Sequence, residues 1–165
     1  MTDLLSRRSA IISKCGLYRR ERIHRWSDAP LLPFLMLNPS DADAYIDDPT
    51  SRRTDGFARR EGAGGTWLEN LYDFRTPSPA ELWKAEAPHS GLDNERALLK
   101  MALQAVADDM PIVCAWGAGA RGRGNFAVQM LRTRGVRLVC LGKTKDGSPR
   151  HPLYVRADQP FEAFP

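Results

Sequence analysis

The feature that most constrains the fold is an apolar run that ends abruptly in a polar tripeptide. The run PFLML at residues 33–37 is followed at once by Asn38, Pro39 and Ser40. An apolar run of this length, bounded by prolines, is typical of a strand buried on both faces of a parallel sheet. In open α/β sheets, ligands bind at the carboxyl ends of such strands. Pro39 restricts the backbone next to Asn38, so the amide of Asn38 is predicted to have a fixed position at this ligand-binding end of the sheet.

Alternating strand-like and helix-like segments predict the fold class. Core strands are expected at residues 31–38, 66–74, 111–116 and 136–141, and helices at 49–60, 80–85, 92–108 and 125–134. Segments 8–18 and 20–26 predict an edge hairpin, and residues 153–155 a short extended piece. This order predicts a three-layer α/β/α sandwich with a central, mostly parallel, four-stranded sheet and the N-terminal hairpin at its edge.

Length and composition narrow the class of protein. The 165 residues are expected to form one domain, residues 1–165. No apolar run approaches the roughly 20 residues of a membrane span, and the N-terminus lacks a signal-peptide core. We therefore expect a cytoplasmic protein without a membrane partner. The three cysteines are far apart in apolar surroundings, which predicts reduced, buried thiols. No cysteine or histidine spacing suits a metal, so neither a metal site nor a cofactor is expected.

Charge is strongly segregated along the chain, although the formal net charge is only +4. Residues 7–25 carry seven basic side chains and one acidic side chain. Residues 26–116 carry eight basic and fifteen acidic side chains, and residues 117–156 carry nine basic side chains and one acidic side chain. Nineteen of the 24 basic residues are arginine, which suits bidentate phosphate contact. One interpretation is a basic rim for a phosphate-bearing partner. The other is a solvated surface in an arginine-rich sequence.

A glycine-rich turn follows the third expected core strand. The segment GAGARG at residues 117–122 has the form of the dinucleotide-binding fingerprint. That fingerprint normally follows the first strand of its unit, and the next strand here has no acidic residue at its end for a ribose hydroxyl. The match is therefore weak. The turn could still hold a phosphate through its backbone amides, with Arg121 and Arg123 beside it.

Two further polar residues stand where sheet ends are expected. His151 lies beyond the last core strand between two prolines, where it could donate a hydrogen bond to a carbonyl or a developing oxyanion. Asn70 is an amide inside an otherwise apolar strand, and its donor and acceptor suit the edge of a base. The alternative for both residues is structural, with each side chain tying down a loop. Phe57 and Trp116 are candidate stacking surfaces, although such aromatic residues are usually core.

The order of these residues resembles the uracil-DNA glycosylase superfamily. The matching pieces are Asn38-Pro39-Ser40, Asn70, Trp116-Gly117 and His151-Pro152-Leu153. The resemblance implies that Asn38 positions or activates water, that Asn70 reads an extruded base, and that His151 contacts the base carbonyl. In this sequence Asn38 stands where the classical uracil enzymes carry aspartate, and Leu153 replaces a phosphate-binding serine.

Residues 18–154 also resemble a bacterial and phage family known as a domain of unknown function, number 1643. The pieces MLNPSDADAYIDDPTSRR, ENLYDFR, AWGAGARGR and LGKTKDGSPRHPLYV carry this resemblance.

Three functions are open at this point. The first is a glycosylase-like domain that binds a nucleobase or nucleic acid and hydrolyses the N-glycosidic bond of a modified or mismatched base. The second is a non-catalytic nucleic-acid or nucleotide-binding module. The third is a metal-assisted enzyme on free nucleotides that uses Asp47 or Asp48 for the metal. The expected catalytic residues are Asn38 and His151, and the expected substrate-binding residues are Ser40, Phe57, Asn70, Trp116, Arg121, Arg123 and Arg150.

The loop that follows Ser40 is unusually acidic for a surface that faces DNA. It could supply the missing carboxylate, bind a divalent cation or repel a duplex. Its acidic residues are Asp41, Asp43, Asp47 and Asp48.

Overall fold

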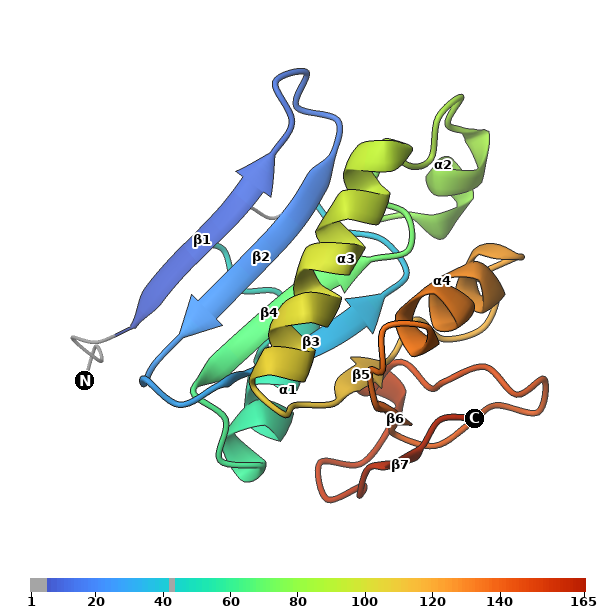
Figure 1. Cartoon of the computed structure of the whole chain (residues 1–165). Coiled ribbons are helices and arrows are strands. Elements are labelled where there is room, and N and C mark those ends of the chain that lie inside the picture. Colours follow the sequence, from blue (N-terminus) through green and yellow to red (C-terminus); the bar gives the residue numbers. More distant parts are fainter. Residues whose placement is uncertain (1–5, 42–43) are drawn as a thin grey trace.

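A computed structural model describes residues 6–41 and 44–165 and shows an α/β protein with a mixed sheet (Figure 1). Within these residues the sheet has seven strands in the order β1-β2-β4-β3-β5-β6-β7. The neighbours among β4, β3, β5 and β6 pair in parallel, whereas β1–β2, β2–β4 and β6–β7 pair antiparallel. The strands are β1 (Arg7–Ile12), β2 (Arg19–Arg25), β3 (Leu31–Met36), β4 (Gly65–Asn70), β5 (Ile112–Cys114), β6 (Leu138–Cys140) and β7 (Glu162–Ala163).

The predicted four-stranded sheet is therefore corrected to seven strands of mixed direction. The N-terminal hairpin continues the sheet, because β2 hydrogen-bonds to β4 with Arg22 opposite Leu68. The C-terminal tail adds β7, whose two residues are too few to show an alternating pattern. The expected strand 66–74 ends at Asn70. The expected extended piece at 153–155 is instead a 3-10 helix, η1 (Pro152–Tyr154), because Pro152 suits its first position.

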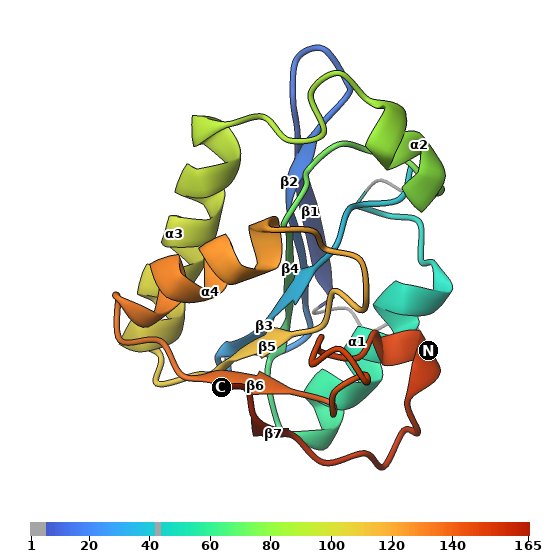
Figure 2. The same ribbon diagram turned by 90° about the vertical axis from the view of Figure 1, so that its right-hand side faces the viewer.

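Helices cover both faces of the sheet, as Figure 2 shows with the sheet seen edge-on. α3 (Leu92–Ala107) and α4 (Arg123–Arg132) lie on one face, and α1 (Pro49–Arg60) lies on the other. α2 (Pro79–Lys84) lies near the end of the sheet where β3 and β4 stop. Among the described residues, no helix combines the length and apolar character that crossing a bilayer requires.

β3 shows why the opening apolar run is continuous. All six of its residues are buried. Leu31 and Leu35 belong to the core cluster that contains α3 and α4, whereas Phe34 and Met36 belong to the cluster that contains α1. Because alternate side chains enter two different cores, the strand needs apolar residues at every position.

The start of α1 is determined locally. Asp48 is its N-cap, with Oδ1 accepting a hydrogen bond of 2.7 Å from the Ser51 amide, and Pro49 occupies the first turn. Both features were predicted, because capping chemistry depends only on neighbouring residues.

The expectation for the cysteines holds for two of the three. Cys114 and Cys140 are buried free thiols, whereas Cys15 is exposed in the turn between β1 and β2. The apolar residues near Cys15 did not indicate burial, because Leu17 beside it is itself exposed.

Candidate functional site

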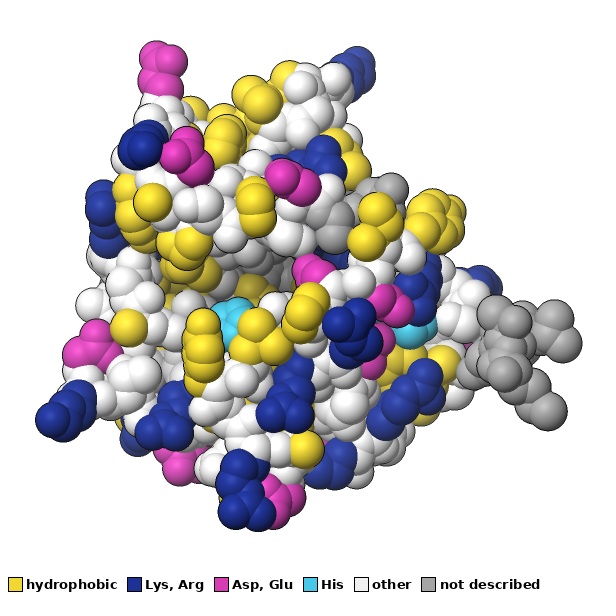
Figure 3. Space-filling model, turned by 180° about the vertical axis from the view of Figure 1, so that it is seen from behind, with side chains coloured by type: hydrophobic (Ala, Val, Ile, Leu, Met, Phe, Trp, Pro, Cys, Tyr) yellow, Lys and Arg dark blue, Asp and Glu magenta, His cyan; other side chains and the backbone are white. Residues whose placement is uncertain are grey.

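A pocket of about 880 Å³ lies at the carboxyl ends of the four parallel strands. Its wall contains residues that follow β3, β5 and β6, the last residue of β4, the start of α1 and the loop that enters η1. Figure 3 shows the molecule from this side, where hydrophobic side chains and a histidine border a hollow in the surface. Of the residues predicted from the sequence, the pocket brings together Asn38, Ser40, Asn70, Trp116, Arg150 and His151.

Asn70 contributes a buried amide to the pocket. It is 3% exposed and lines the cavity. Its backbone carbonyl accepts a hydrogen bond of 3.0 Å from Asn94 Nδ2, but its side-chain amide has no partner among the described residues. Neither polar atom of this amide belongs to the fully buried side-chain atoms that lack a partner, so the amide faces the cavity. The amide is therefore available to a ligand that presents both a donor and an acceptor.

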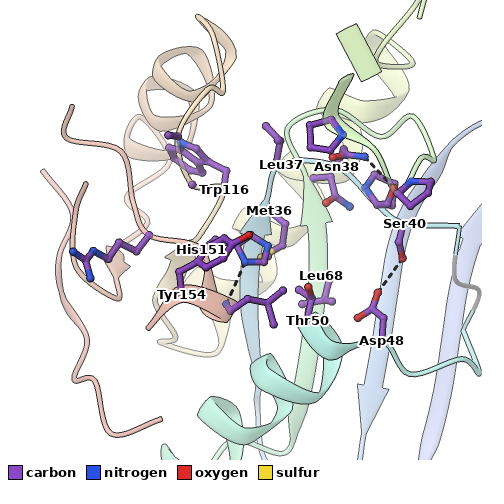
Figure 4. A pocket seen from close by; sticks show the side chains of 18 of the residues that line it. Met36, Leu37, Asn38, Ser40, Asp48, Thr50, Leu68, Trp116, His151 and Tyr154 are labelled. Carbon is purple, nitrogen blue, oxygen red and sulfur yellow. Dashed lines mark hydrogen bonds between the residues drawn. The ribbon is translucent and has the colours of Figure 1, made fainter. Parts of the chain in front are cut away.

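His151 contributes a neutral hydrogen-bond donor. Its Nδ1 accepts a hydrogen bond of 3.2 Å from the Leu153 amide, which leaves the ring proton on Nε2. Burial lowers the pKa of His151, although the charge of Asp48 opposes this shift. The ring stands in the pocket beside Met36 (Figure 4). A neutral ring with its proton on Nε2 can stabilise negative charge on a bound group.

The side-chain nitrogen of Asn38 has a structural role. Its Nδ2 donates to the carbonyl oxygens of Thr76, at 2.8 Å, and Pro39, at 3.1 Å. Its Oδ1 has no hydrogen-bond partner in the part of the chain that the structure describes. Asn38 therefore fastens two loops together and leaves an acceptor oxygen on a residue of the pocket wall.

Ser40 and Asp48 form a hydrogen-bonded pair in the same wall. Ser40 Oγ donates to Asp48 Oδ2 at 2.9 Å, as Figure 4 shows. Burial raises the pKa of Asp48, but hydrogen bonds from Ser51 and Ser40 outweigh it and lower the pKa below its ordinary value. The pocket therefore contains an ionised carboxylate.

Arg19 reaches the pocket because the hairpin contains a β-bulge. Ile11 pairs with Glu21, but Ile12 pairs with Arg19, so the strand opposite has one extra residue. Arg20 and Glu21 consequently both bond to α3, through Asp93 and Lys100, at 2.8 Å each. Arg19 is turned toward the pocket, where it is 5% exposed. Bulges often redirect a side chain in this way. Burial, with the nearby charge of Arg22, lowers the pKa of Arg19 to about 10.

The loops after β5 and before η1 are fastened to each other. Gly117 has φ +74° and donates its amide hydrogen to the Pro149 carbonyl at 2.8 Å. A Cβ at Gly117 would lie 3.5 Å from Cβ of His151. The Gly117 turn thus positions the histidine, which explains a glycine after β5 without a dinucleotide.

Comparison with known families assigns the chain. The sequence of residues 20–153 matches the family described as "Protein of unknown function (DUF1643)". The chain belongs to this family. No curated protein and no solved structure shows a significant match.

The DUF1643 match includes almost the whole pocket wall. It begins one residue after Arg19 and ends one residue before Tyr154, and both of these residues line the pocket. Every other lining residue falls inside the match.

Three of the predicted site residues lie outside the pocket of this DUF1643 protein. Phe57 is 2% exposed and belongs to the core under α1. Arg123 donates to the Leu71 carbonyl at 2.8 Å and to Asn94 Oδ1 at 2.5 Å, so it joins α4 to α3 and to the residue that follows β4. Arg121 stacks on Trp83 at 3.9 Å and borders a smaller hollow of about 340 Å³. The stacking and phosphate roles expected for these residues do not follow from their positions.

Several lining residues were missed by sequence reasoning. Tyr154 is 79% exposed, and its ring centroid lies 5.7 Å from that of His151. Tyr154 follows His151 by three residues in the same proline-rich loop, and this closeness in sequence could have indicated that it lines the pocket. Arg19 had no local signal, because its direction depends on pairing with β1. The other missed lining residues include Met36, Thr50, Leu68, Thr144 and Lys145.

Two aspartates of the acidic loop have structural roles, in ion pairs and in a helix cap. Asp47 pairs with Arg8 at 2.9 Å and with Arg22 at 3.3 Å, and Asp48 caps α1. Asp43 lies outside the described residues. Within residues 6–41 and 44–165, no group of three or more His, Cys, Asp or Glu side chains is arranged to hold a metal. The metal-assisted alternative therefore has no ligand set in the described part of the loop.

Proposed function

We propose that the pocket binds a nucleobase of a nucleic acid or nucleotide and that the protein hydrolyses the N-glycosidic bond of that base, as the uracil-DNA glycosylase superfamily does. The observation that carries this proposal is the buried, unpartnered amide of Asn70 in a pocket that also contains the neutral ring of His151. An amide offers a donor and an acceptor side by side, which matches the edge of a base.

The walls of the pocket suit the rest of a base. Met36 and Leu68 provide apolar surface on the α1 side of the sheet, the side that Asn70 also faces. An extruded base is commonly held between apolar or aromatic side chains while its edge is read by hydrogen bonds. The cations Arg19, Lys145 and Arg150 line the same cavity and suit the phosphates of a nucleotide.

Hydrolysis requires few groups. The oxygen of a water molecule forms a bond to C1′ of the sugar and releases one proton to the solvent, the C1′–N bond breaks, and its electron pair leaves with the base. The Nε2–H of His151 would stabilise the negative charge on the departing base, and Oδ1 of Asn38 would accept a hydrogen bond from the water. Removal of one such preorganised donor typically lowers kcat by about 10²–10³.

The test uses oligonucleotides that contain uracil, hydroxymethyluracil, hypoxanthine or a mismatch. We expect abasic product from at least one of them, and we expect His151→Ala to lower the rate by about 10²–10³. His89→Ala is the matched control, because His89 does not line the pocket. Absence of abasic product from the whole panel would contradict hydrolysis.

A second candidate is a nucleobase-binding module without catalysis. One observation favours it: the amide nitrogen of Asn38 donates to two loop carbonyls, so this residue has a structural role that requires no reaction. Binding of the same oligonucleotides without product, with affinity that falls steeply as salt increases, would support the module.

A further inference from the structure

Asp48 is the single carboxylate among the described residues that line the pocket. Asp48 is the N-cap of α1, and it also belongs to the acidic loop that was expected to be able to supply a missing carboxylate. The structure places its carboxylate in the wall of the cavity that contains Asn70 and His151. A capping role alone does not explain why Asp48 lines the same cavity as Asn70 and His151.

The carboxylate is held in a fixed orientation by both of its oxygens. Oδ1 accepts from the Ser51 amide at 2.7 Å, and Oδ2 accepts from Ser40 Oγ at 2.9 Å. Each carboxylate oxygen can accept more than one hydrogen bond. A water molecule in the pocket can therefore donate to Asp48 without displacing either partner.

The charges of the pocket match those of a glycosidic transition state. As the C1′–N bond breaks, positive charge develops on the sugar and negative charge on the base. Figure 4 shows Asp48 and His151 in separate parts of the wall, at the start of α1 and at the start of η1. One part therefore offers a carboxylate and the other offers a hydrogen-bond donor.

We propose that Asp48 is the catalytic carboxylate of this site, in addition to capping α1. The inference rests on the proposed hydrolysis. Asp48 accepts a proton from the attacking water as the O–C1′ bond forms, and the electron pair of the broken C1′–N bond leaves with the base beside His151. Ser40 is a positioning residue, because it acts on the reaction through Asp48. This assignment supplies the carboxylate that Asn38 does not provide.

The test separates the two roles of Asp48 by using neutral residues that also cap helices. Asparagine and serine are as good as aspartate at the N-cap position. Asp48→Asn and Asp48→Ser are therefore expected to stay folded, with a lower melting temperature at pH 7 because the hydrogen-bonded carboxylate stabilises the native state. They are expected to keep the affinity for the oligonucleotide that wild type cleaves best. They are expected to lower the single-turnover rate by about 10²–10⁴, the usual worth of a general base. Asp47→Asn is the matched control, because Asp47 is the neighbouring carboxylate and does not line the pocket.

The pH profile gives a readout that loss of a cap would not produce. Arg19 and Arg22 from β2 act on Asp48 through their charges, and Asp48 acts on His151 in the same way. Lys145 and Arg150, from the chain that leads to η1, are the other charged residues of the pocket wall among the described residues. The wild-type rate is expected to fall as pH decreases through the lowered pKa of Asp48, and this acidic limb is expected to be absent in Asp48→Asn.

Each outcome decides between the two proposals. If wild type cleaves and both neutral-cap variants cleave at the wild-type rate, Asp48 is only a cap, and the proposed function stands. If wild type gives no abasic product with any oligonucleotide, the proposed hydrolysis fails, and the catalytic role of Asp48 fails with it. If both variants fold, bind and lose cleavage while Asp47→Asn keeps it, the inference is supported.

Discussion

Two neighbouring residues of β4 carry buried polar groups into opposite sides of the sheet. Asn70 faces the pocket on the α1 side. Glu69 is fully buried on the other side, where its Oε1 accepts a hydrogen bond of 3.0 Å from Trp67 Nε1. Its Oε2 has no hydrogen-bond partner among the described residues. At the residue scale, the first group is available to a ligand, whereas the second is a cost to the fold that protonation reduces.

Asn70→Leu tests whether the amide serves a ligand. Because the wild-type amide has no partner among the described residues, we expect the free energy of unfolding to stay equal or to rise by about 1 kcal/mol. Affinity for an oligonucleotide or nucleobase is expected to fall roughly tenfold or more. Urea denaturation and ligand titration measure the two effects.

Asn94→Leu is the matched control for this change. Asn94 is also fully buried, but both ends of its amide are bonded, to the Asn70 carbonyl and to Arg123. Its replacement is expected to lower stability by about 1–3 kcal/mol. If Asn70→Leu were destabilising to the same degree, the amide of Asn70 would have a structural role instead.

Glu69→Gln tests the buried carboxyl. Burial raises the pKa of Glu69 well above its ordinary value of 4.5. Folding therefore favours the protonated form, so its contribution to stability is full below the unfolded-state pKa and is lost as pH rises through the folded-state pKa. We expect the variant to gain stability over wild type as pH rises, by about 1–3 kcal/mol at pH 8. Urea denaturation from pH 5 to pH 8 measures this gain, and a pH-independent difference would contradict it.

At the scale of elements, α1 holds the loop that carries His151. Arg53, on the second turn of α1, donates Nε to the Pro152 carbonyl at 3.1 Å and Nη2 to the Val155 carbonyl. These carbonyls belong to the first residue of η1 and to its C-cap, and His151 is its N-cap. The same helix therefore provides Asp48 at its start and fixes the position of His151 farther along.

Arg53→Ala is expected to loosen the η1 loop. Loss of charged hydrogen bonds typically costs about 1.5–3 kcal/mol. We expect faster amide hydrogen exchange at residues 152–156 and a lower affinity for the ligand. Arg52→Ala serves as control, because Arg52 is exposed on the same helix and its side chain bonds to the Asp47 carbonyl at 3.4 Å. Equal exchange in the two variants would show that Arg53 does not hold the loop.

At the scale of the whole molecule, the two edge strands of the sheet lie outside the family match. β1 covers the edge of β2, and β7 covers the edge of β6, but the match begins at residue 20 and ends at residue 153. The tail also places Phe164 against Trp116, with ring centroids 5.6 Å apart. Uncovered strand edges pair with other chains and promote aggregation.

A chain restricted to residues 20–153 is therefore expected to be much less stable than the full chain and to aggregate. Size-exclusion chromatography and urea denaturation compare this chain with the full chain. A monomeric 20–153 chain with an unchanged midpoint would show that the edge strands are dispensable.

The sequence alone determined the elements whose causes are local. The order of strands and helices from β1 to β6 and the cap at Asp48 follow from neighbouring residues. The same is true of the polar residues Asn38, Asn70 and His151 at strand or loop ends. Expected helix bounds lie within two residues of the observed ones for the same reason. Hydrophobic periodicity and helix capping depend on residues a few positions apart, so the sequence alone is enough to predict them.

Only the tertiary structure decided which of these residues meet. Pairing of β2 with β4 made a mixed sheet, and a bulge opposite Ile12 directed Arg19 into the pocket. Packing of α1 enclosed Phe57 in the core and brought Asp48 into the same wall as His151. These outcomes depend on contacts between segments far apart in the chain, and strand register is determined by such contacts and not by local preference. That is why the sequence identifies Asp48 as a cap within an acidic loop, but only the fold shows that it is the carboxylate of that loop that lines the pocket.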